Sequence, residues 1–340
     1  MKILITGGCG FIGSNLSNFL KNKKYKVETL DNLQRKGSVL NLKLNKKNKI
    51  KNHRVDIANF KKINSLPKYD IIIDCCAEPS VEASKKNLDR VFNTNLIGTL
   101  NILKKCIKDK SKLIFLSSSR VYSIKSLSAL VNKNQLNKEF KLNKEIDLKF
   151  DTSAPRSIYG YTKLSSEELI KELSYSFKIK YLINRLGVIA GPRQMGKVDQ
   201  GFFSLWIWKH LNKMPLKYIG YEGYGSQKRD VLHIDDLKEL IFLQIKKIKK
   251  INNLTLSIGG GKKNLLSLRQ LTKICVKLTG NNCSFSSSKK TSIYDIPYFC
   301  TSNTLVKKIY GWVPKRNINR IALDILNWQK QDYKKLKKYL

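Results

Sequence analysis

The chain has 340 residues, which is long enough to bury a large core and to form two lobes. Hydrophobic residues make up 41% of it, which excludes a disordered chain, and no apolar run reaches the roughly 18 residues that a membrane span needs. The formal net charge is +41, but only 11 of the 66 basic residues are Arg, and the Lys residues are spread over the whole chain. A nucleic-acid site gathers basic side chains on one element, so we interpret the charge as a compositional bias and expect neither a nucleic-acid nor a membrane partner.

The cysteines and histidines point away from metal and disulfide chemistry. Seven cysteines are scattered without a C-x-x-C pair, and three histidines lie far apart in the sequence. We therefore expect no metal site, and free thiols in a reducing compartment. Because the chain enters a strand pattern directly after Met1, we expect no signal peptide and a cytoplasmic location.

The first element along the chain is a short apolar strand followed by a glycine-rich turn. Residues 2–6 (KILIT) are predicted to form the strand, and Gly7, Gly10 and Gly13 follow before a helical pattern over 15–20. Glycines at such a turn let backbone N–H groups approach a pyrophosphate at the positive N-terminus of the helix. Strand, glycines and helix together predict a dinucleotide site rather than an ordinary turn.

A second predicted strand, 25–30, ends at Asp31. A carboxylate at this place accepts hydrogen bonds from both hydroxyls of an adenosine ribose and repels a 2′-phosphate. The predicted cofactor is therefore NAD rather than NADP.

A polar, Lys- and Asn-rich loop is predicted before residue 54. From there, strands and helices continue to alternate up to residue 186. We expect strands over 54–57, 70–75, 112–117 and 180–186, helices over 89–105 and 161–176, and an irregular insertion over 126–151. This alternation predicts an α/β fold with a parallel, doubly wound Rossmann sheet.

Beyond residue 187 the pattern changes to short strands with frequent Gly, Pro and aromatic residues. Helices are predicted over 202–212, 235–248, 267–279 and 318–333, and a strand over 254–258. We therefore expect an NAD-binding Rossmann domain over 1–186, to which 229–258 returns, and a smaller α/β substrate-binding lobe built from 187–228 and 259–340.

Candidate proton-handling residues lie at the end of one strand and the start of one helix. Tyr159 and Lys163 are spaced to share one face of a helix N-terminus. A phenol has a pKa of roughly 10, and a neighbouring ammonium favours the phenolate that acts as a base. Ser117–Ser119 end the strand 112–117, so their hydroxyls are expected at the carboxyl edge of the sheet, beside a cofactor that takes the hydride.

The chain resembles the extended short-chain dehydrogenases/reductases and, among them, the NAD-dependent sugar-nucleotide epimerase/dehydratase family, over essentially its full length. The matching segments are TGGCGFIG (6–13), 31–33, 55–57, 95–99, 118–122, Tyr159 with Lys163, 191–192 and RDVLHIDD (229–236). The resemblance implies Ser118 as the catalytic hydroxyl, Tyr159 as the acid/base and Lys163 as its partner. The cofactor-binding residues that it implies are Gly7, Gly10, Phe11, Ile12, Gly13, Asp31, Asn32, Asp56, Ile57, Ala77, Tyr159 and Lys163.

Finer details of the resemblance concern the reaction. Dehydratases of the family carry an Asp-Glu pair directly after the catalytic hydroxyl, where this chain has Ser119 and Arg120, so we expect no dehydration. The segments most similar to the CDP-paratose 2-epimerase (CDP-tyvelose epimerase) branch are 31–37, 193–194, 199–201 and 227–233. The substrate-binding residues that this implies are Arg193, Gln194, Asp199, Gln200 and Arg229.

The resemblance implies a nucleotide-sugar epimerase that inverts C2 of a CDP-linked deoxyhexose by transient oxidation to a ketone. A UDP-sugar 4-epimerase, or another sugar-nucleotide enzyme of the family, would use the same residues and is an open alternative. An alternative of another class is a non-catalytic NAD-fold protein that binds RNA through its lysines. The family commonly dimerises through the helices near 89–105 and 161–176, so a homodimer is also implied.

Overall fold

The structure is a computed structural model that describes residues 1–80, 87–132, 136, 140–198 and 200–340. It divides into two compact units. The first contains Met1–Ser118, Ile158–Arg185 and Lys238–Leu256, and the second contains Ser119–Ser157, Leu186–Leu237 and Ser257–Leu340.

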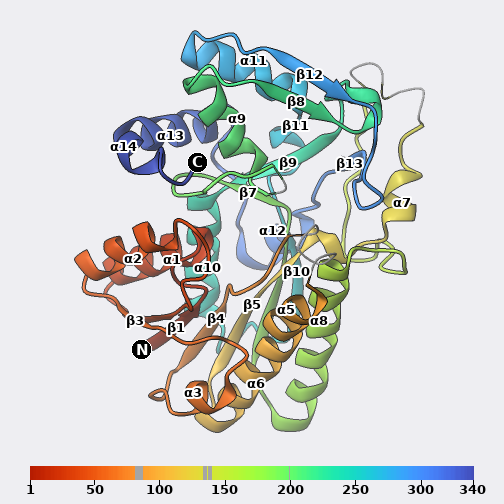
Figure 1. Cartoon of the computed structure of the whole chain (residues 1–340). Coiled ribbons are helices and arrows are strands. Elements are labelled where there is room, and N and C mark those ends of the chain that lie inside the picture. The colour runs from red at the N-terminus through yellow and green to blue at the C-terminus, as the bar shows by residue number, and fades with distance from the viewer. Residues whose placement is uncertain (81–86, 133–135, 137–139, 199) are drawn as a thin grey trace. The chain divides into compact units, whose positions relative to one another are not determined.

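The first unit is a sheet with helices on both faces (Figure 1). Its elements in chain order are β1 (Lys2–Thr6), α1 (Phe11–Asn22), β2 (Lys26–Leu30), α2 (Ser38–Lys47), β3 (Lys51–His53), α3 (Phe60–Asn64), β4 (Ile71–Asp74), α5 (Leu88–Phe92), a π-helical turn (Asn93–Ile97), α6 (Gly98–Asp109), β5 (Lys112–Ser118), α8 (Ile158–Phe177), β6 (Tyr181–Leu186), α10 (Ile234–Lys247) and β10 (Leu254–Ile258). Helix α10 starts in the second unit, and β10 ends there.

The predicted fold class is confirmed, because the sheet is parallel and doubly wound. Its seven strands lie in the order β10-β6-β5-β4-β1-β2-β3. The chain winds outward from β1 to β3 and then returns to build the other half from β4 to β10. The reversal lies between β1 and β4, and ligands of doubly wound sheets bind at the carboxyl ends of the strands at such a reversal. The glycine turn that follows β1 is therefore at the expected place.

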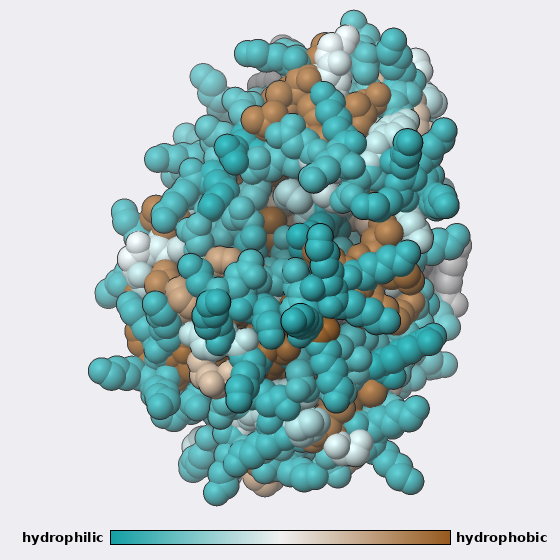
Figure 2. Space-filling view, turned by 90° about the vertical axis from the view of Figure 1, so that its left-hand side faces the viewer, coloured by the Kyte–Doolittle hydropathy of each residue, from teal (hydrophilic) through white to brown (hydrophobic). Residues whose placement is uncertain are grey.

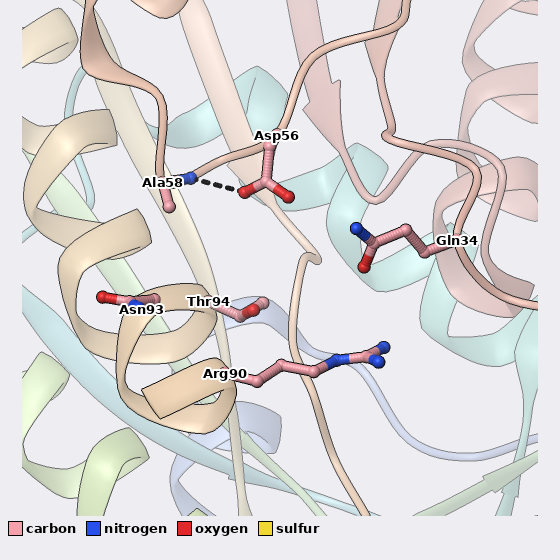
Figure 3. Close-up of a pocket in the computed structure, with 6 residues that line it drawn as sticks. All are labelled: Gln34, Asp56, Ala58, Arg90, Asn93 and Thr94. Atoms are coloured by element: carbon pink, nitrogen blue, oxygen red, sulfur yellow. Dashed lines mark hydrogen bonds between the residues drawn. The ribbon is translucent and has the colours of Figure 1, made fainter. Parts of the chain in front are cut away.

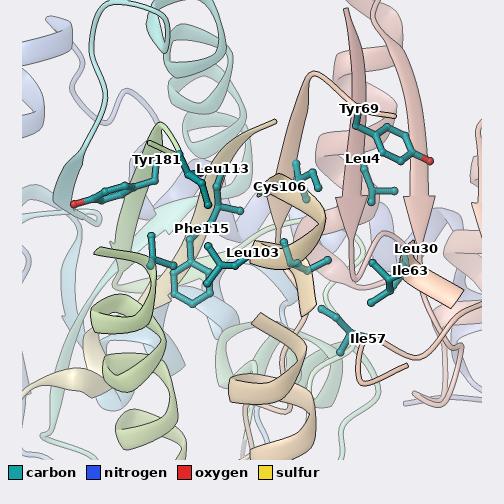
Figure 4. Close-up of a cluster of buried hydrophobic side chains, with 14 of the residues drawn as sticks. Leu4, Leu30, Ile57, Ile63, Tyr69, Leu103, Cys106, Leu113, Phe115 and Tyr181 are labelled. Atoms are coloured by element: carbon teal, nitrogen blue, oxygen red, sulfur yellow. The ribbon is translucent and has the colours of Figure 1, made fainter. Parts of the chain in front are cut away.

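One face of this sheet changes from apolar to polar along the strands. Near the amino ends, Leu4, Leu113 and Tyr181 pack in a buried cluster with Leu103 of α6 (Figure 4). Side chains alternate along a strand, so the same face continues with residues two positions further on. Toward the carboxyl ends it therefore carries the buried polar residues Thr6, Asp74, Ser117 and Arg185.

The opposite face is covered by α1 and α10. The rings of Phe19 in α1 and Phe242 in α10 meet edge to face, with their centroids 6.0 Å apart. Asn184 of β6 and Gln244 of α10 exchange two amide hydrogen bonds of 3.0 and 2.8 Å, which satisfies both buried side chains.

The structure differs from the sequence prediction between residues 38 and 57. The predicted polar loop contains the helix α2, and the predicted strand 54–57 is replaced by β3 at Lys51–His53. The buried side of α2 consists of polar residues. The side-chain amides of Asn41 and Asn45 donate hydrogen bonds to the backbone oxygens of Cys9 and Gly8, each with a donor–acceptor distance of 3.0 Å. A helix that buries amides has no hydrophobic period, so the pattern could not indicate it.

The second unit contains shorter strands and several helices. Its elements are a 3-10 turn (Ser119–Val121), α7 (Ile124–Ser128), β7 (Val188–Ala190), α9 (Phe202–Leu211), β8 (Leu216–Ile219), a second 3-10 turn (Tyr221–Gly223), β9 (Lys228–His233), a third 3-10 turn (Lys262–Asn264), β11 (Leu265–Ser267), α11 (Leu268–Thr279), β12 (Phe285–Ser288), β13 (Tyr298–Phe299), α12 (Thr304–Tyr310), α13 (Ile318–Gln331) and α14 (Tyr333–Leu336). Strand β9 pairs with β7, β11 and β13, and β8 pairs with β12.

Residues 119–157, including the predicted insertion, lie in this second unit. Ile146 forms a β-bridge with Thr301, and Phe140 packs in a small apolar cluster with Tyr298 and Cys300. The insertion is thus held by contacts with residues about 150 positions later in the chain, which local sequence patterns do not reveal.

Hydrophilic side chains predominate on the face shown in Figure 2, with hydrophobic ones in scattered patches. Within the part of the chain that is described, no helix combines the length and the hydropathy of a membrane span. All seven cysteines are free thiols, and Cys9, Cys106, Cys275 and Cys300 are buried.

Candidate active site

The glycine turn after β1 is built so that only glycine fits its two critical positions. Gly7 has a φ of 59°, and a Cβ there would lie 3.1 Å from Cys75 O and Cys76 Cα. A Cβ on Gly13 would lie 2.2 Å from Gly7 O. Gly10 accepts the first helical hydrogen bond, from Ser14 N over 3.0 Å, and so caps α1. The turn therefore presents bare backbone directly before a helix N-terminus.

The N-terminus of α1 and the carboxylate of Asp31 provide complementary ends of a dinucleotide site. The first turn of α1 contains no acidic side chain, so its positive end is not neutralised from within. Asp31 accepts hydrogen bonds from Cys9 N over 2.9 Å and from Leu33 N over 2.8 Å. Burial raises the pKa of Asp31, while these two N–H groups and Arg35 act against that shift. Asp31 is thus fixed beside the glycine turn with lone pairs left for ribose hydroxyls.

Asp56 lines a pocket beside this turn. Asn32 Nδ2 donates to Asp56 Oδ2 over 2.8 Å, and Ala58 N donates to Asp56 Oδ1 over 2.9 Å. The pocket has a volume of about 540 Å³, and Arg90 and Gln34 extend toward it below Asp56 (Figure 3). The residues that line it are Gln34, Asp56, Ala58, Arg90, Asn93 and Thr94.

The other residues that the sequence assigns to the cofactor do not line this pocket. Phe11 and Ile12 form the first turn of α1 and are partly exposed, and Ala77 lies in the segment after β4. Ile57 is buried in the core, in contact with Gly98, so its side chain faces away from solvent. Sequence reasoning did not find Arg90, because the helix that carries it is far from Asp56 in the chain and no local motif marks it.

Glu78 joins the two segments that flank this pocket. Its carboxylate pairs with Arg35 over 2.9 Å and with Arg90 over 2.8 Å, while its own side chain is only 6% exposed. Asn95, in the π-helical turn, accepts from Glu78 N over 2.8 Å and donates to Thr162 Oγ1 of α8 over 3.0 Å. The segment after β4 is therefore fixed between the loop after β2, α5 and α8.

The three residues assigned to catalysis lie on two packed elements of the first unit. Ser118 ends β5, and Tyr159 and Lys163 are one turn apart at the start of α8. Lys163 is 1% exposed, and its Nζ lies 3.8 Å from the centroid of the Phe115 ring of β5. The strand and the helix thus bring a hydroxyl, a phenol and an ammonium to the carboxyl end of the sheet.

A buried ion pair fixes α8 against the sheet just below these residues. Arg185 of β6 binds Glu167 of α8 through Nε, at 3.1 and 3.0 Å from the two carboxylate oxygens, and through Nη2 at 2.8 Å. Ser117 Oγ donates to the same carboxylate over 2.5 Å. This bidentate pair holds the helix turn that carries Lys163.

In the second unit, Arg229 is positioned by a loop. It lies near the start of β9, where its guanidinium donates to Lys228 O over 2.8 Å, to Asp295 Oδ1 over 3.0 Å and to Ile296 O. Burial lowers the pKa of Arg229, and the Asp295 carboxylate opposes that shift. A guanidinium held in this way keeps its charge in a partly buried place, as anion binding requires.

The remaining residues assigned to the substrate follow β7. Arg193 has a φ of 74°, and Gln194 Nε2 donates to Ile189 O over 2.9 Å, which ties its side chain to β7. Gln200 forms a backbone bridge with Lys197, and Asp199 lies outside the described residues.

Arg193 and Arg229 do not come together. Strands β7 and β9 are parallel, with Val188 opposite Val231 and Ala190 opposite His233. Arg193 follows the end of β7, whereas Arg229 precedes this paired stretch. The two guanidinium groups therefore lie toward opposite ends of the strand pair.

Comparison with known proteins agrees with a dinucleotide site of this kind. Residues 3–259 match the NAD dependent epimerase/dehydratase family. The chain is 30% identical to the CDP-paratose 2-epimerase of Salmonella typhi over 286 residues, which cover 81% of this chain and 83% of that protein. It is 28% identical to the UDP-glucuronate 4-epimerase of Thermodesulfobacterium geofontis over 347 residues, which cover 98% of each. Among solved structures, UDP-glucuronic acid 4-epimerase from Bacillus cereus, in complex with UDP-glucuronic acid and NAD, is 25% identical with a TM-score of 0.82, covering 97% of this chain and 99% of that one.

Proposed function

This chain belongs to the NAD dependent epimerase/dehydratase family and uses NAD, and we propose that within this family it is a nucleotide-sugar epimerase that inverts C2 of a CDP-linked deoxyhexose. The observation that carries the catalytic part is the placement of Tyr159 and Lys163 on α8, beside the end of β5 at Ser118. The similarity to a CDP-paratose 2-epimerase supports the choice of substrate. In this proposal the first unit holds NAD and the second unit takes the nucleotide sugar.

The bare backbone at Gly7 and Gly13 and the carboxylate of Asp31 fit NAD, since a Cβ would fill the space at the turn. The N-terminus of α1 would hold the pyrophosphate, Asp31 the adenosine ribose, and the pocket beside Asp56 the adenine. Bound there, NAD would supply reversible hydride transfer to and from a carbinol carbon.

Tyr159 acts as the acid and base of the proposed reaction. Its phenolate takes the proton from the sugar hydroxyl as the carbinol becomes a ketone, and the phenol returns that proton after the sugar has turned its other face. The Lys163 ammonium stabilises the phenolate, and Ser118 donates a hydrogen bond to the same sugar oxygen. Arg229 holds the diphosphate while the sugar moves.

Elimination of water is disfavoured by the residues that follow Ser118. They form the 3-10 turn Ser119–Val121, in which Arg120 Nη1 donates to Tyr294 O over 2.9 Å. Neither Ser119 nor Arg120 supplies the carboxyl groups that the resemblance assigns to dehydratases.

The decisive experiment identifies the carbon that is inverted. Purified enzyme is incubated with CDP-linked and UDP-linked sugars, and the products are resolved by proton NMR. Substrates deuterated at C2 or at C4 show by a primary isotope effect which C–H bond breaks. We expect inversion and an isotope effect at C2 of a CDP-sugar. Inversion at C4 of a UDP-sugar would favour the 4-epimerase, and RNA binding at physiological salt without turnover would favour the RNA-binding alternative.

We further propose that the protein forms a homodimer through the surface shared by α5, the π-helical turn and α8. Leu88, Ile97 and Tyr161 are 52%, 40% and 46% exposed, and the Phe92 ring lies 6.1 Å from that of Tyr161. Exposed apolar side chains of this kind favour burial against a second copy. Sedimentation equilibrium tests this proposal, and a monomer for the wild type contradicts it.

A further inference from the structure

Asp74 lies in a row of side chains across three strands of the first unit. It ends β4, where the strand register pairs it with Thr6 of β1 on one side and with Phe115 of β5 on the other. Residues paired in parallel strands point to the same face of a sheet, and adjacent strands are about 4.8 Å apart. Asp74 therefore lies next to the Phe115 ring on the face that α8 covers.

The ammonium of Lys163 lies over that ring, 3.8 Å from its centroid. Asp74 and Lys163 are 0% and 1% exposed, so both charged groups are removed from water. The two described side chains form no direct ion pair, but their charges interact across the buried face of the sheet, in a medium where charges interact more strongly than in water.

Only one of the two oxygens of Asp74 is fully engaged. Thr6 Oγ1 donates to Asp74 Oδ1 over 2.5 Å, and Cys76 N donates to the same oxygen over 3.3 Å. Thr6 Oγ1 itself accepts from Cys75 N and Cys76 N, so its proton is directed at Asp74. Within the described residues, Asp74 Oδ2 has no partner in hydrogen-bond geometry, and the nearby Thr99 hydroxyl, which lowers the pKa of Asp74, donates its proton to Asn95 O over 2.7 Å. Most buried polar atoms in folded proteins are hydrogen-bonded, so this oxygen is open to interaction with a nearby charge.

The other groups that face Lys163 leave its charge uncompensated. Glu167, one turn further along α8, is neutralised by Arg185 of β6. The thiols of Cys75 and Cys76, which follow β4, are neutral because burial raises the pKa of both. Burial lowers the pKa of Lys163 and raises that of Asp74, and the charge of each group opposes the shift of the other.

We propose that Asp74 is a positioning residue, whose buried carboxylate keeps the Lys163 ammonium charged and in place one turn from Tyr159. The link to catalysis rests on the proposed function, whereas the electrostatic interaction between the two side chains does not. Asp74 acts only through Lys163 and needs no contact with the substrate.

The test titrates Lys163 directly by NMR. The holoenzyme is labelled with lysine carrying ¹³C at Cε, and the Lys163 signal is identified by its loss in Lys163→Arg and by the ring-current shift that Phe115→Leu abolishes. We expect Lys163 to be protonated at pH 7.5 in the wild type. In Asp74→Asn its titration midpoint should fall by roughly one to three pH units, the effect of an opposite charge at close range.

Asp109→Asn is the matched control, because Asp109 is also a buried carboxylate of the first unit and pairs with Lys105 over 2.9 Å. It should leave the midpoint of Lys163 unchanged. Asp74→Ser replaces the first variant if Asp74→Asn does not fold. A neutral Lys163 at pH 7.5 in the wild type, or an unchanged midpoint in the neutral variants of Asp74, overturns the proposal.

The pH dependence of kcat/KM then connects this interaction to turnover. The alkaline limb should move to lower pH in Asp74→Asn and stay in place in Asp109→Asn. A lower rate with unmoved limbs means that Asp74 has only a structural role. If the wild type converts no nucleotide sugar, the proposed function fails, while the NMR titration still decides whether Asp74 holds the charge of Lys163.

Discussion

Two arginine–carboxylate pairs, one in each unit, show how differently the same residue types are used. In the first unit, Arg185 and Glu167 form a bidentate pair, with side chains that are 8% and 0% exposed. In the second, Arg229 reaches Asp295 through one nitrogen over 3.0 Å, and these side chains are 13% and 26% exposed. The first pair joins a strand to a helix, whereas the second joins a strand to a loop.

This difference distinguishes a pair that connects two packed elements from a pair that holds an arginine beside a loop. Arg185 binds Glu167 through two nitrogens, so its charge helps to fix α8. Arg229 also donates to the backbone oxygens of Lys228 and Ile296, which orient its guanidinium without neutralising it. The first pair thus fixes the helix turn next to Lys163, and the second holds the arginine that the proposed function assigns to the anionic substrate.

The largest expected effect is at Tyr159, on the helix α8 that the first pair fixes. Tyr159→Phe should lower kcat by roughly two to four orders of magnitude, because the general acid and base is lost while the ring still fills its place. Steady-state kinetics measures this, with Tyr161→Phe on the exposed side of the same helix as the control. A near wild-type rate for Tyr159→Phe would remove Tyr159 from the mechanism.

Breaking the pair between Arg185 and Glu167 should lower the free energy of unfolding of the first unit. Glu167→Gln removes the carboxylate that binds the buried Arg185 guanidinium, which is expected to cost about 3–5 kcal/mol of unfolding free energy. Urea unfolding measures the loss. Glu168→Gln, which breaks an exposed pair with Lys171 on the same helix, should cost about 0–1 kcal/mol. Equal losses in the two variants would contradict the assigned role of Glu167.

The pair in the second unit should affect the substrate more than the fold. Arg229→Lys replaces a forked donor by a single ammonium, so we expect KM for the nucleotide sugar to rise about tenfold, or about 1.4 kcal/mol, with kcat nearly unchanged. Arg269→Lys is the control, because Arg269 donates to a loop oxygen of the same unit, that of Tyr224. An unchanged KM in Arg229→Lys would exclude Arg229 from the substrate site.

The smallest expected effect concerns the ion pairs of Glu78 with the partly exposed side chains of Arg35 and Arg90. Glu78→Gln weakens the pairs with Arg35 and Arg90 beside the pocket, and partly exposed pairs contribute about 0.2–1 kcal/mol. Release of bound NAD, followed by exchange with labelled NAD, should therefore become about twofold to fivefold faster. Asp89→Asn changes the neighbouring charge on α5 and should leave the release rate unchanged. A slower release in Glu78→Gln would show that these pairs hinder rather than retain the cofactor.

Local patterns in the sequence were sufficient where one element carries the whole signal. The strand β1, the glycine turn and the start of α1 form one continuous segment, so their spacing predicted the dinucleotide turn. Tyr159 and Lys163 share a helix face for the same reason. By contrast, the helix α2 was missed because its buried side consists of Ser38, Asn41 and Asn45, which carry no hydrophobic period.

The sequence by itself determined the alternation of strands and helices, the glycine turn and the residue types at the start of α8, because these depend on neighbours within a few positions. Only the tertiary structure decided that Asp74 and Lys163 share the Phe115 face of the sheet and that Arg193 and Arg229 lie toward opposite ends of β7 and β9. Such placements follow from strand order and register, which depend on contacts between residues far apart in the chain. Burial then gives these contacts their energetic weight, since a charge removed from water must find its partner in the folded protein.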